Sequence, residues 1–168
     1  MPTVDVKVYF LQMLSAYRKS VPAPRAGLSV IHAKNPTLAY YRFLYHGVGE
    51  AYHWYTRGRM PDEELRESLS HPRHELHVLH VDGTPAGMAE LDCRTDDIEL
   101  VQFGLMPEFI GQGLGKYFLQ WTIDHVWARQ PERFWLHTCT LDHPVALPNY
   151  LKAGFVLCQE EMIQRELD

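Results

Sequence analysis

Three glycines stand at alternate positions, Gly111, Gly113 and Gly115, and this cluster constrains the fold more than any other feature of the chain. A β-type run at residues 98–105 precedes them, and an amphipathic stretch begins at Leu114. A strand that turns through glycines directly into a helix lets backbone N–H groups converge where the helix carries its partial positive charge. The sequence therefore predicts a turn that binds a phosphate or pyrophosphate group.

Two common phosphate-binding turns do not fit this segment. A Walker loop needs Ser or Thr after its Gly-Lys pair, but Lys116 is followed by Tyr117, so a nucleoside triphosphate is disfavoured. A dinucleotide-binding turn follows the first strand of a parallel βαβ unit, whereas this turn follows a predicted meander of strands. A glycine-rich turn without a ligand stays open as an alternative.

The order of predicted elements indicates a mixed α/β fold. Asp82 and Gly83 separate two β-rich runs and predict a hairpin, and Pro61 followed by acidic residues predicts the start of a helix. We expect strands at residues 28–33, 75–81, 86–93, 98–105, 134–141 and 155–163, and helical segments at 37–54, 61–69, 113–130 and 145–152. This order predicts a central, mostly antiparallel sheet with helices on both faces.

Length and composition favour one soluble domain. The 168 residues, of which 46% are hydrophobic and 22% charged, suit a single domain over 1–168 with an N-terminal extension of about 1–25. We expect part of this extension to add a strand or helix at the edge of the fold. The net charge of −5 and the absence of a Lys/Arg cluster disfavour nucleic acid, and the apolar stretch 8–14 is too short to span a membrane.

The cysteines and histidines predict neither disulfides nor a metal centre. Three cysteines without a C-x-x-C pair fit a reducing, cytoplasmic setting. His74, His77 and His80 recur every third residue, a spacing that alternates between the faces of a strand and cannot gather three ligands. We therefore predict no structural metal.

The glycine turn resembles a known cofactor signature. Leu105 and Pro107 correspond to the strand end of that signature. Gly113 and Gly115 correspond to its two glycines, and Ile110 stands where it usually has Arg or Gln. The segment is similar to the acetyl-CoA signature of the GNAT superfamily of N-acetyltransferases.

A second stretch resembles the last helix of the same superfamily. Ala146 and Tyr150 fall at the matching helical positions, and Gly154 and Phe155 match the Gly-Phe pair that follows. His143 replaces the Asn that the family usually carries. The two motifs occur in the family order, with a helix and a strand between them.

The resemblance implies the fold, the cofactor and the reaction. It implies a GNAT-like sheet whose strand ending at Leu105 splays from the next one, leaving the N–H groups of Phe103 and Leu105 for the acetyl oxygen and pantetheine. It implies an N-acetyltransferase that transfers acetyl from acetyl-CoA directly to an amine in a ternary complex. The residues expected to bind acetyl-CoA are Phe103, Gly104, Leu105, Ile110, Gly111, Gln112, Gly113, Leu114, Gly115, Lys116, His143 and Tyr150.

The resemblance also suggests catalytic roles. Tyr150 corresponds to the residue near the thioester sulfur, and a phenol can return a proton to a thiolate, so we expect it to be the general acid. Glu99 has the spacing of the catalytic glutamate of the histone-acetylating branch. Glu90, on the neighbouring strand, is the alternative base, and a water chain is a third. Direct attack requires no acyl-cysteine, and we expect none at Cys139.

The acceptor side is expected to lie in the aromatic segment between the first helices. Tyr41, Trp54 and Tyr55 are the candidate acceptor contacts, because aromatic rings can receive a cation or an apolar group. Glu90 and His137 complete the expected set. Packing of these aromatic residues in a helix face stays open as the alternative.

The sequence leaves the acceptor and the assembly open. We expect a small-molecule or peptide amine as acceptor, with a homodimer as one alternative for the oligomeric state. A catalytically weak acyl-CoA-binding sensor is the alternative function, and a longer acyl donor or an oxygen acceptor is a third.

Overall fold

The computed structural model describes residues 1–17 and 19–167. From residue 28 onward, the strands and α-helices of these residues follow one another in the order that the sequence predicts. Along the chain they are β1 (Thr3–Met13), β2 (Leu28–His32), α1 (Leu38–Gly49), α2 (Asp62–Ser70), β3 (His74–Val81), β4 (Thr84–Asp92), β5 (Asp97–Leu105), α3 (Leu114–Trp127), β6 (Arg133–Cys139), α4 (Ala146–Lys152) and β7 (Val156–Glu166).

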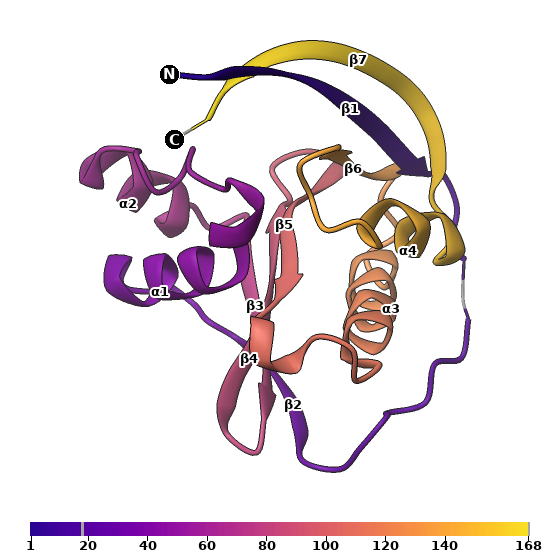
Figure 1. Cartoon of the computed structure of the whole chain (residues 1–168). Coiled ribbons are helices and arrows are strands. Elements are labelled where there is room, and N and C mark those ends of the chain that lie inside the picture. The colour runs from indigo at the N-terminus through magenta and orange to yellow at the C-terminus, as the bar shows by residue number, and fades with distance from the viewer. Residues whose placement is uncertain (18, 168) are drawn as a thin grey trace.

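The strands form one sheet in the order β2-β3-β4-β5-β6-β1-β7. The helices lie on both faces of the sheet, with α1 and α2 on one side and α3 and α4 on the other (Figure 1). This arrangement confirms the predicted mixed α/β fold. Among the described helices, none is long and apolar enough to cross a membrane.

Each face of the sheet has its own hydrophobic core. The core under α1 and α2 contains Tyr41 and Leu65 of these helices and Leu76 and Met88 of the sheet. The larger core under α3 and α4 contains Leu11, Leu79, Leu91, Leu100, Phe118, Ile123, Phe134, Leu136 and Phe155. Burial of these side chains at roughly 1.5–3 kcal/mol each supplies most of the stability and holds the two helix layers against the sheet.

The predicted β3–β4 hairpin is confirmed, and its turn explains the position of the dipeptide. Asp82 has φ of +49° and Gly83 has φ of +84°. Two consecutive positive φ angles match the twist of the flanking strands, and Gly and Asp tolerate them best.

β5 and β6 are parallel, and they separate after a short paired stretch. They pair from Asp97 to Glu99 on β5 and from Arg133 to Trp135 on β6. Beyond these residues β5 continues beside β4, and β6 continues beside β1. The predicted splayed strand pair is thereby confirmed, and it opens a gap inside the sheet.

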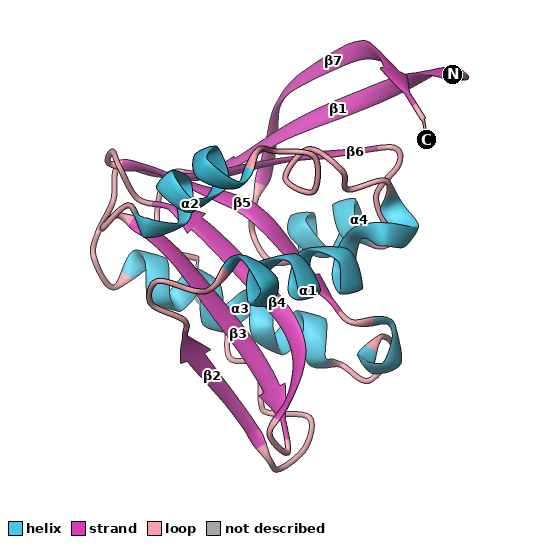
Figure 2. Cartoon of the chain, turned by 90° about the vertical axis from the view of Figure 1, so that its left-hand side faces the viewer, coloured by secondary structure: helices cyan, strands magenta, loops and turns pink. Residues whose placement is uncertain are grey.

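The N-terminal segment forms a strand, but the expectation that it lies at the edge of the fold is wrong. β1 lies between β6 and β7, with Val8 opposite both Cys139 and Glu161. Val6 and Val8 are buried, as are Leu11 and Met13 further along. A strand with one such buried face fits a position inside the sheet, and β1 pairs with β6 on one edge and with β7 on the other. Figure 2 shows β1 and β7 as a paired ribbon that rises away from the other strands.

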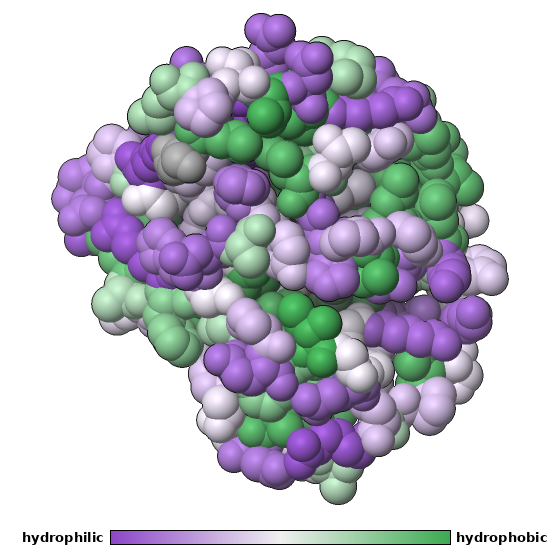
Figure 3. Space-filling view, in the orientation of Figure 1, coloured by the Kyte–Doolittle hydropathy of each residue, from purple (hydrophilic) through white to green (hydrophobic). Residues whose placement is uncertain are grey.

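β7 is the outer strand of this ribbon, and apolar side chains remain at its surface. Figure 3 shows apolar residues gathered along the upper right of the molecule, where Figure 1 draws β7. The exposed apolar residues of β7 are Val156, Leu157, Met162 and Ile163.

Candidate active site

A cavity of about 1230 Å³ occupies the gap between β5 and β6. Its walls come from β5, β6, β1 and β7, from the glycine turn, from α4, and from the loop that follows α1. The cavity passes through the sheet, because lining residues come from both the α3/α4 side and the α1 side.

The glycine turn forms one end of this cavity. Gly113 has φ of +79° and caps the N-terminus of α3, and Gly111 has φ of +84°. A Cβ added at Gly111 would meet no described atom within 4 Å, so the space in front of the loop is open. Gly111, Gly113, Gly115 and Lys116 all line the cavity. Converging amides, a helix N-terminus and an ammonium group suit a pyrophosphate.

The edge of β5 presents backbone donors to the gap. The Met106 N–H donates to the carbonyl oxygen of Ala86 at 2.8 Å, on the β4 side. Alternate amides of a strand point to opposite edges, so the N–H groups of Phe103 and Leu105 point toward the diverging β6. These are the two amides that the sequence analysis named. Gly104 packs toward α1, where a Cβ would come within 2.4 Å of Val48 Cγ1.

Tyr150 lies on the α3/α4 side of the gap. Its side chain is 9% exposed, and its ring contacts those of Phe103 and Phe155 at centroid distances of 6.3 and 6.0 Å. Burial, with the nearby Asp142 carboxylate, raises the pKa of the Tyr150 hydroxyl. The hydroxyl therefore keeps its proton at neutral pH, as a proton donor must.

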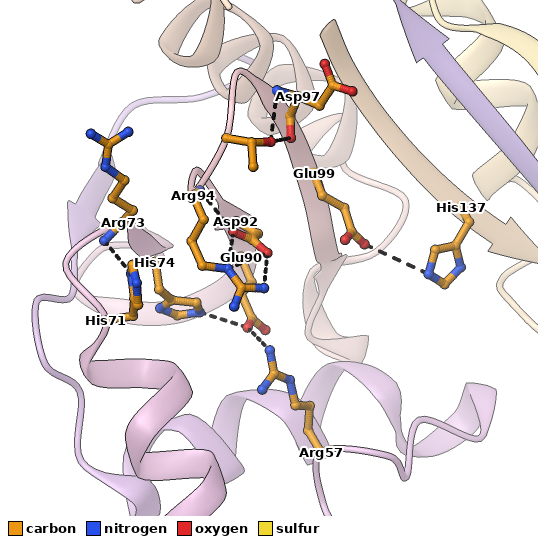
Figure 4. Close-up of polar contacts among 11 residues, drawn as sticks. Arg57, His71, Arg73, His74, Glu90, Asp92, Arg94, Asp97, Glu99 and His137 are labelled. Carbon is orange, nitrogen blue, oxygen red and sulfur yellow. Dashed lines mark hydrogen bonds and ion pairs between the residues drawn. The ribbon is translucent and has the colours of Figure 1, made fainter.

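Glu99 and His137 face each other on the opposite side of the gap. Figure 4 shows their side chains reaching from β5 and β6 toward one another, and Glu99 Oε2 lies 4.0 Å from His137 Nε2. Burial raises the pKa of Glu99 to about 6, and the carboxylates of Asp92 and Glu90 add to the shift. Burial also lowers the pKa of His137. Glu99 can therefore accept a proton near neutral pH, whereas burial disfavours the protonated form of His137.

Glu90 lies behind the cavity wall and has three close partners. Tyr41 Oη donates to Glu90 Oε1 at 2.5 Å, and Arg57 Nη2 donates to Glu90 Oε2 at 3.0 Å. His74 Nε2 lies 2.8 Å from the same Oε2 (Figure 4). The Glu90 side chain is fully buried and does not line the cavity, whereas Arg57 does. Burial and the Glu90 carboxylate raise the pKa of Tyr41 well above its usual value.

The loop after α1 covers the cavity on the α1 side of the sheet. Trp54 Nε1 donates to Asp142 Oδ1 at 3.4 Å, and Asp142 also accepts hydrogen bonds from the Thr138 hydroxyl and from the Cys139 N–H at 3.0 Å. These bonds end β6 at Cys139, two residues earlier than predicted. The Tyr52 and His143 rings contact each other at a centroid distance of 5.5 Å. The loop thus reaches the β6–α4 connection from across the gap.

Tyr55 joins the same loop to β7. Its hydroxyl donates to the carbonyl oxygen of Glu166 at 2.6 Å and accepts from Arg165 Nε at 3.0 Å. The guanidinium groups of Arg59 and Arg165 lie 4.2 and 4.8 Å from the centre of its ring. The Tyr55 ring therefore contacts two cations of the protein itself, whereas the sequence predicted that it would contact the acceptor.

The structure brings together most of the residues that the sequence singled out. The cavity is lined by Trp54, Glu99, Phe103, Gly104, Leu105, Ile110, Gly111, Gly113, Gly115, Lys116, His137, His143 and Tyr150. Tyr41, Tyr55, Glu90, Gln112 and Leu114 lie outside that lining. The Gln112 side chain donates back to the carbonyl oxygen of Glu108 at 3.1 Å, and Leu114 is fully buried in the core.

Several residues that line the cavity were not predicted from the sequence. Phe10, Arg57, Glu161 and Arg165 all face the cavity. Three of them belong to β1 and β7, whose place in the sheet depends on contacts between distant parts of the chain. Only their alternation along a strand could have indicated a common face.

Cys139 lines the cavity, but its surroundings do not activate it. Burial and the Asp142 carboxylate raise the pKa of the Cys139 thiol above its usual value. A nucleophilic cysteine needs the opposite shift, because the thiolate is the reactive form.

Comparisons with known proteins agree with this geometry. The sequence profile of the acetyltransferase (GNAT) family matches residues 40–155. A GCN5-related N-acetyltransferase from Sphaerobacter thermophilus is 14% identical, with a TM-score of 0.66 over 95% of this chain and 50% of that one. The chain thus spans half the length of that structure.

Two further structures have the same fold. The ribosomal-protein-S18-alanine N-acetyltransferase from Escherichia coli is 18% identical, with a TM-score of 0.62 over 79% of both chains. An aminoglycoside acetyltransferase from an uncultured soil sample is 16% identical, with a TM-score of 0.60 over 76% of this chain and 88% of that one. A search of the curated proteins finds no match to the chain.

Proposed function

Because the chain belongs to the acetyltransferase (GNAT) family, we propose that it transfers an acetyl group from acetyl-CoA to an amine. One observation carries the proposal. A single cavity runs through the gap between β5 and β6, from the glycine turn on one side of the sheet to Glu99 on the other. Cofactor and acceptor can therefore enter from opposite sides and meet in the gap.

The residues present fit acetyl-CoA. The amides around Gly111 and Gly113 and the Lys116 side chain would hold the pyrophosphate, since the space in front of Gly111 is open and the loop lines the cavity. The free amide edge at Phe103 and Leu105 would hold the pantetheine and the acetyl oxygen. Ile110 replaces a side-chain donor of the family signature, so backbone amides carry this contact. Bound here, acetyl-CoA supplies the acetyl group as a reactive thioester.

On the acceptor side, Glu99 would take the proton that the amine must lose. Its pKa of about 6 leaves it ionised at neutral pH while keeping it basic enough to accept a proton. His137, 4.0 Å away, lies where it can orient the carboxylate or share a bridging water. A lone pair on the acceptor nitrogen then forms the new N–C bond as the C–S bond breaks.

Backbone amides and Tyr150 would serve the other half of the reaction. The Phe103 or Leu105 N–H would donate to the acetyl oxygen as it gains negative charge, a contact worth about 3 kcal/mol in comparable sites. Tyr150, protonated at neutral pH, would return a proton to the departing sulfur. In this account Glu99 and Tyr150 act on opposite sides of the sheet.

The acceptor contacts would come from the loop after α1 and from β6. Trp54 and His137 line that part of the cavity, and Arg57, Glu161 and Arg165 add charge of both signs. Aminoglycosides and alanine-terminated peptides are the first acceptors to test, because two proteins of similar fold are named for such substrates.

The test is a calorimetric titration with acetyl-CoA, followed by a free-thiol assay across aminoglycosides, polyamines, amino acids and alanine-terminated peptides. We expect the protein to bind acetyl-CoA and to release free CoA thiol in the presence of at least one amine. Glu99→Gln should lose this thiol release. Binding of acetyl-CoA without thiol release in the presence of any amine would favour an acyl-CoA sensor. Ile110 and His143, which depart from the family signature, support that alternative. Absence of acetyl-CoA binding would overturn the proposal.

A further inference from the structure

We propose that His32, Glu75 and His77 form a site for a divalent transition metal of the zinc class, on the sheet face under α3. Their ligand atoms all lie within 4.8 Å of one another. None of the three lines the cavity, so the site is separate from the candidate active site.

Strand pairing brings the three residues together. His32 of β2 lies directly opposite His77 of β3, and the two rings are 4.6 Å apart between centroids. Glu75 lies two residues before His77 and therefore on the same face of β3. His77 Nε2 is 2.8 Å from Glu75 Oε1. The prediction of no structural metal considered only the spacing of histidines along one strand, whereas this site takes ligands from two.

Small movements convert the arrangement into a coordination shell. Zinc bonds imidazole nitrogen and carboxylate oxygen at about 2.0–2.2 Å in tetrahedral geometry, which sets neighbouring donor atoms about 3.3 Å apart. The 2.8 Å contact between His77 and Glu75 opens slightly, and the exposed His32 ring turns inward. The metal would bind His77 at Nε2, and the neutral ring would then carry its proton on Nδ1, with no net release of a proton. Water completes a set of two imidazoles and one carboxylate.

α3 and the residues just after it supply the groups that hold the carboxylate in place. Arg129 Nη1 donates to Glu75 Oε2 at 2.7 Å and Nη2 donates to Oε1 at 3.2 Å, so Oε1 would turn from the longer of these two contacts to the metal. His125 Nε2 lies 2.9 Å from Oε1, and its ring stacks on Trp121 with 7° between the planes. Carboxylate ligands of metals commonly have such hydrogen-bonded support. Burial by itself raises the pKa of Glu75, but hydrogen bonds from His125, His77 and Arg129 outweigh it and hold that pKa well below its usual range.

The test uses the full chain after dialysis against a chelator, titrated with ZnCl₂ by calorimetry and with CoCl₂ by visible absorption. We expect one ion per chain at micromolar affinity and the strong absorption of four-coordinate cobalt. His32→Ala, an exposed position, should weaken zinc binding at least about tenfold. His80→Ala is the matched control on the same strand, since the His80 ring contacts the carbonyl oxygen of Val78 instead.

Each outcome decides the proposal. Loss of binding in His32→Ala, with binding retained in His80→Ala, would support the site, and Glu75→Gln should repeat the loss. Millimolar binding by the unmodified chain, equal binding by His32→Ala, or equal loss in both histidine variants would overturn it. Circular dichroism of each variant checks that it is folded, and none of these readouts depends on acetyl transfer.

Discussion

The Tyr55 hydroxyl donates a 2.6 Å hydrogen bond to the carbonyl oxygen of Glu166, 111 residues further along the chain. This bond fastens the loop after α1, which carries the cavity-lining residues Trp54 and Arg57, to the end of β7. The loop is therefore held by the C-terminal strand, and the proposed acceptor contacts depend on it.

Tyr55→Phe should weaken acceptor binding. The substitution removes the bonds to Glu166 and from Arg165, each worth about 0.5–1.5 kcal/mol, so the KM for the acceptor should rise at least about twofold, while the KM for acetyl-CoA stays unchanged. Steady-state kinetics with each substrate varied in turn checks this. Tyr17→Phe, at an exposed tyrosine outside the cavity lining, is the matched control. A Tyr55→Phe enzyme with unaltered kinetics would mean that the loop holds its position without this bond.

Glu99 should control the acidic side of the pH profile. Its pKa is about 6, and a base acts only when deprotonated, so kcat/KM should rise between pH 5 and 7 with a midpoint near 6. Glu99→Gln should lose this rise together with most of the turnover. If the variant kept the wild-type rate and profile, a water chain would be the better account of proton removal.

The same substitution should stabilise the fold at neutral pH. A carboxyl whose folded pKa lies above its unfolded value binds more protons when folded, so its contribution to stability falls as the pH rises from about 4.5 through 6. Glu99→Gln should therefore raise the free energy of unfolding by about 1–2 kcal/mol at pH 7.5 and change it little at pH 4. Denaturant unfolding at the two pH values measures this. Equal stability of both proteins at pH 7.5 would contradict the raised pKa.

Gly111 and Gly83 form a matched pair for testing the cofactor loop. Both have φ of +84°, and an added Cβ would meet no described atom within 4 Å at either position. Gly111→Ala and Gly83→Ala should each cost about 1–2 kcal/mol of stability, the strain of a left-handed conformation. Only Gly111→Ala should weaken acetyl-CoA binding, because its Cβ would project toward the pyrophosphate. Calorimetry of both variants checks the difference, and equal affinity in the two would argue against this loop as the cofactor site.

Glu90 should matter to stability. Glu90→Gln leaves the partly buried Arg57 guanidinium without its anionic partner, and the loss should cost up to about 3–5 kcal/mol, the range for fully buried pairs. Glu63→Gln removes an exposed partner of Arg66 and should cost less than about 1 kcal/mol. Urea unfolding of the two variants provides the comparison. Similar stabilities would mean that water enters and solvates Arg57.

The sequence predicted much of this arrangement because the relevant signals are local. Period-2 runs, the Asp82-Gly83 turn and the glycine cluster specify their own elements whatever lies around them. The segment from Phe103 to Lys116, proposed to bind the cofactor, is continuous in sequence and follows from the same local signals. Most of its residues line the cavity, whereas Gln112 and Leu114 do not.

The part of the cavity proposed to bind the acceptor could not be predicted in the same way, since it is assembled from distant segments. The alternation of Val4, Val6 and Val8 is that of a strand, but nothing local indicates that this strand lies between β6 and β7. The aromatic residues Tyr41 and Tyr55 were expected at the acceptor, yet their hydroxyls bind Glu90 and Glu166. Propensity identifies an aromatic segment, and only tertiary contacts determine which ring faces the cavity.

The position of β1 between β6 and β7 also means that both of its partner strands are synthesised late. The Lys7 N–H donates to Thr140 Oγ1, 133 residues later, and at about 5–20 residues per second that partner is synthesised roughly 7–27 s afterwards. Throughout this interval the apolar residues of β1 have no strand to pair with and stay open to aggregation. Chaperones that hold extended apolar segments would act on the nascent chain at this stage, and the cavity acquires its last wall only when the final strand emerges.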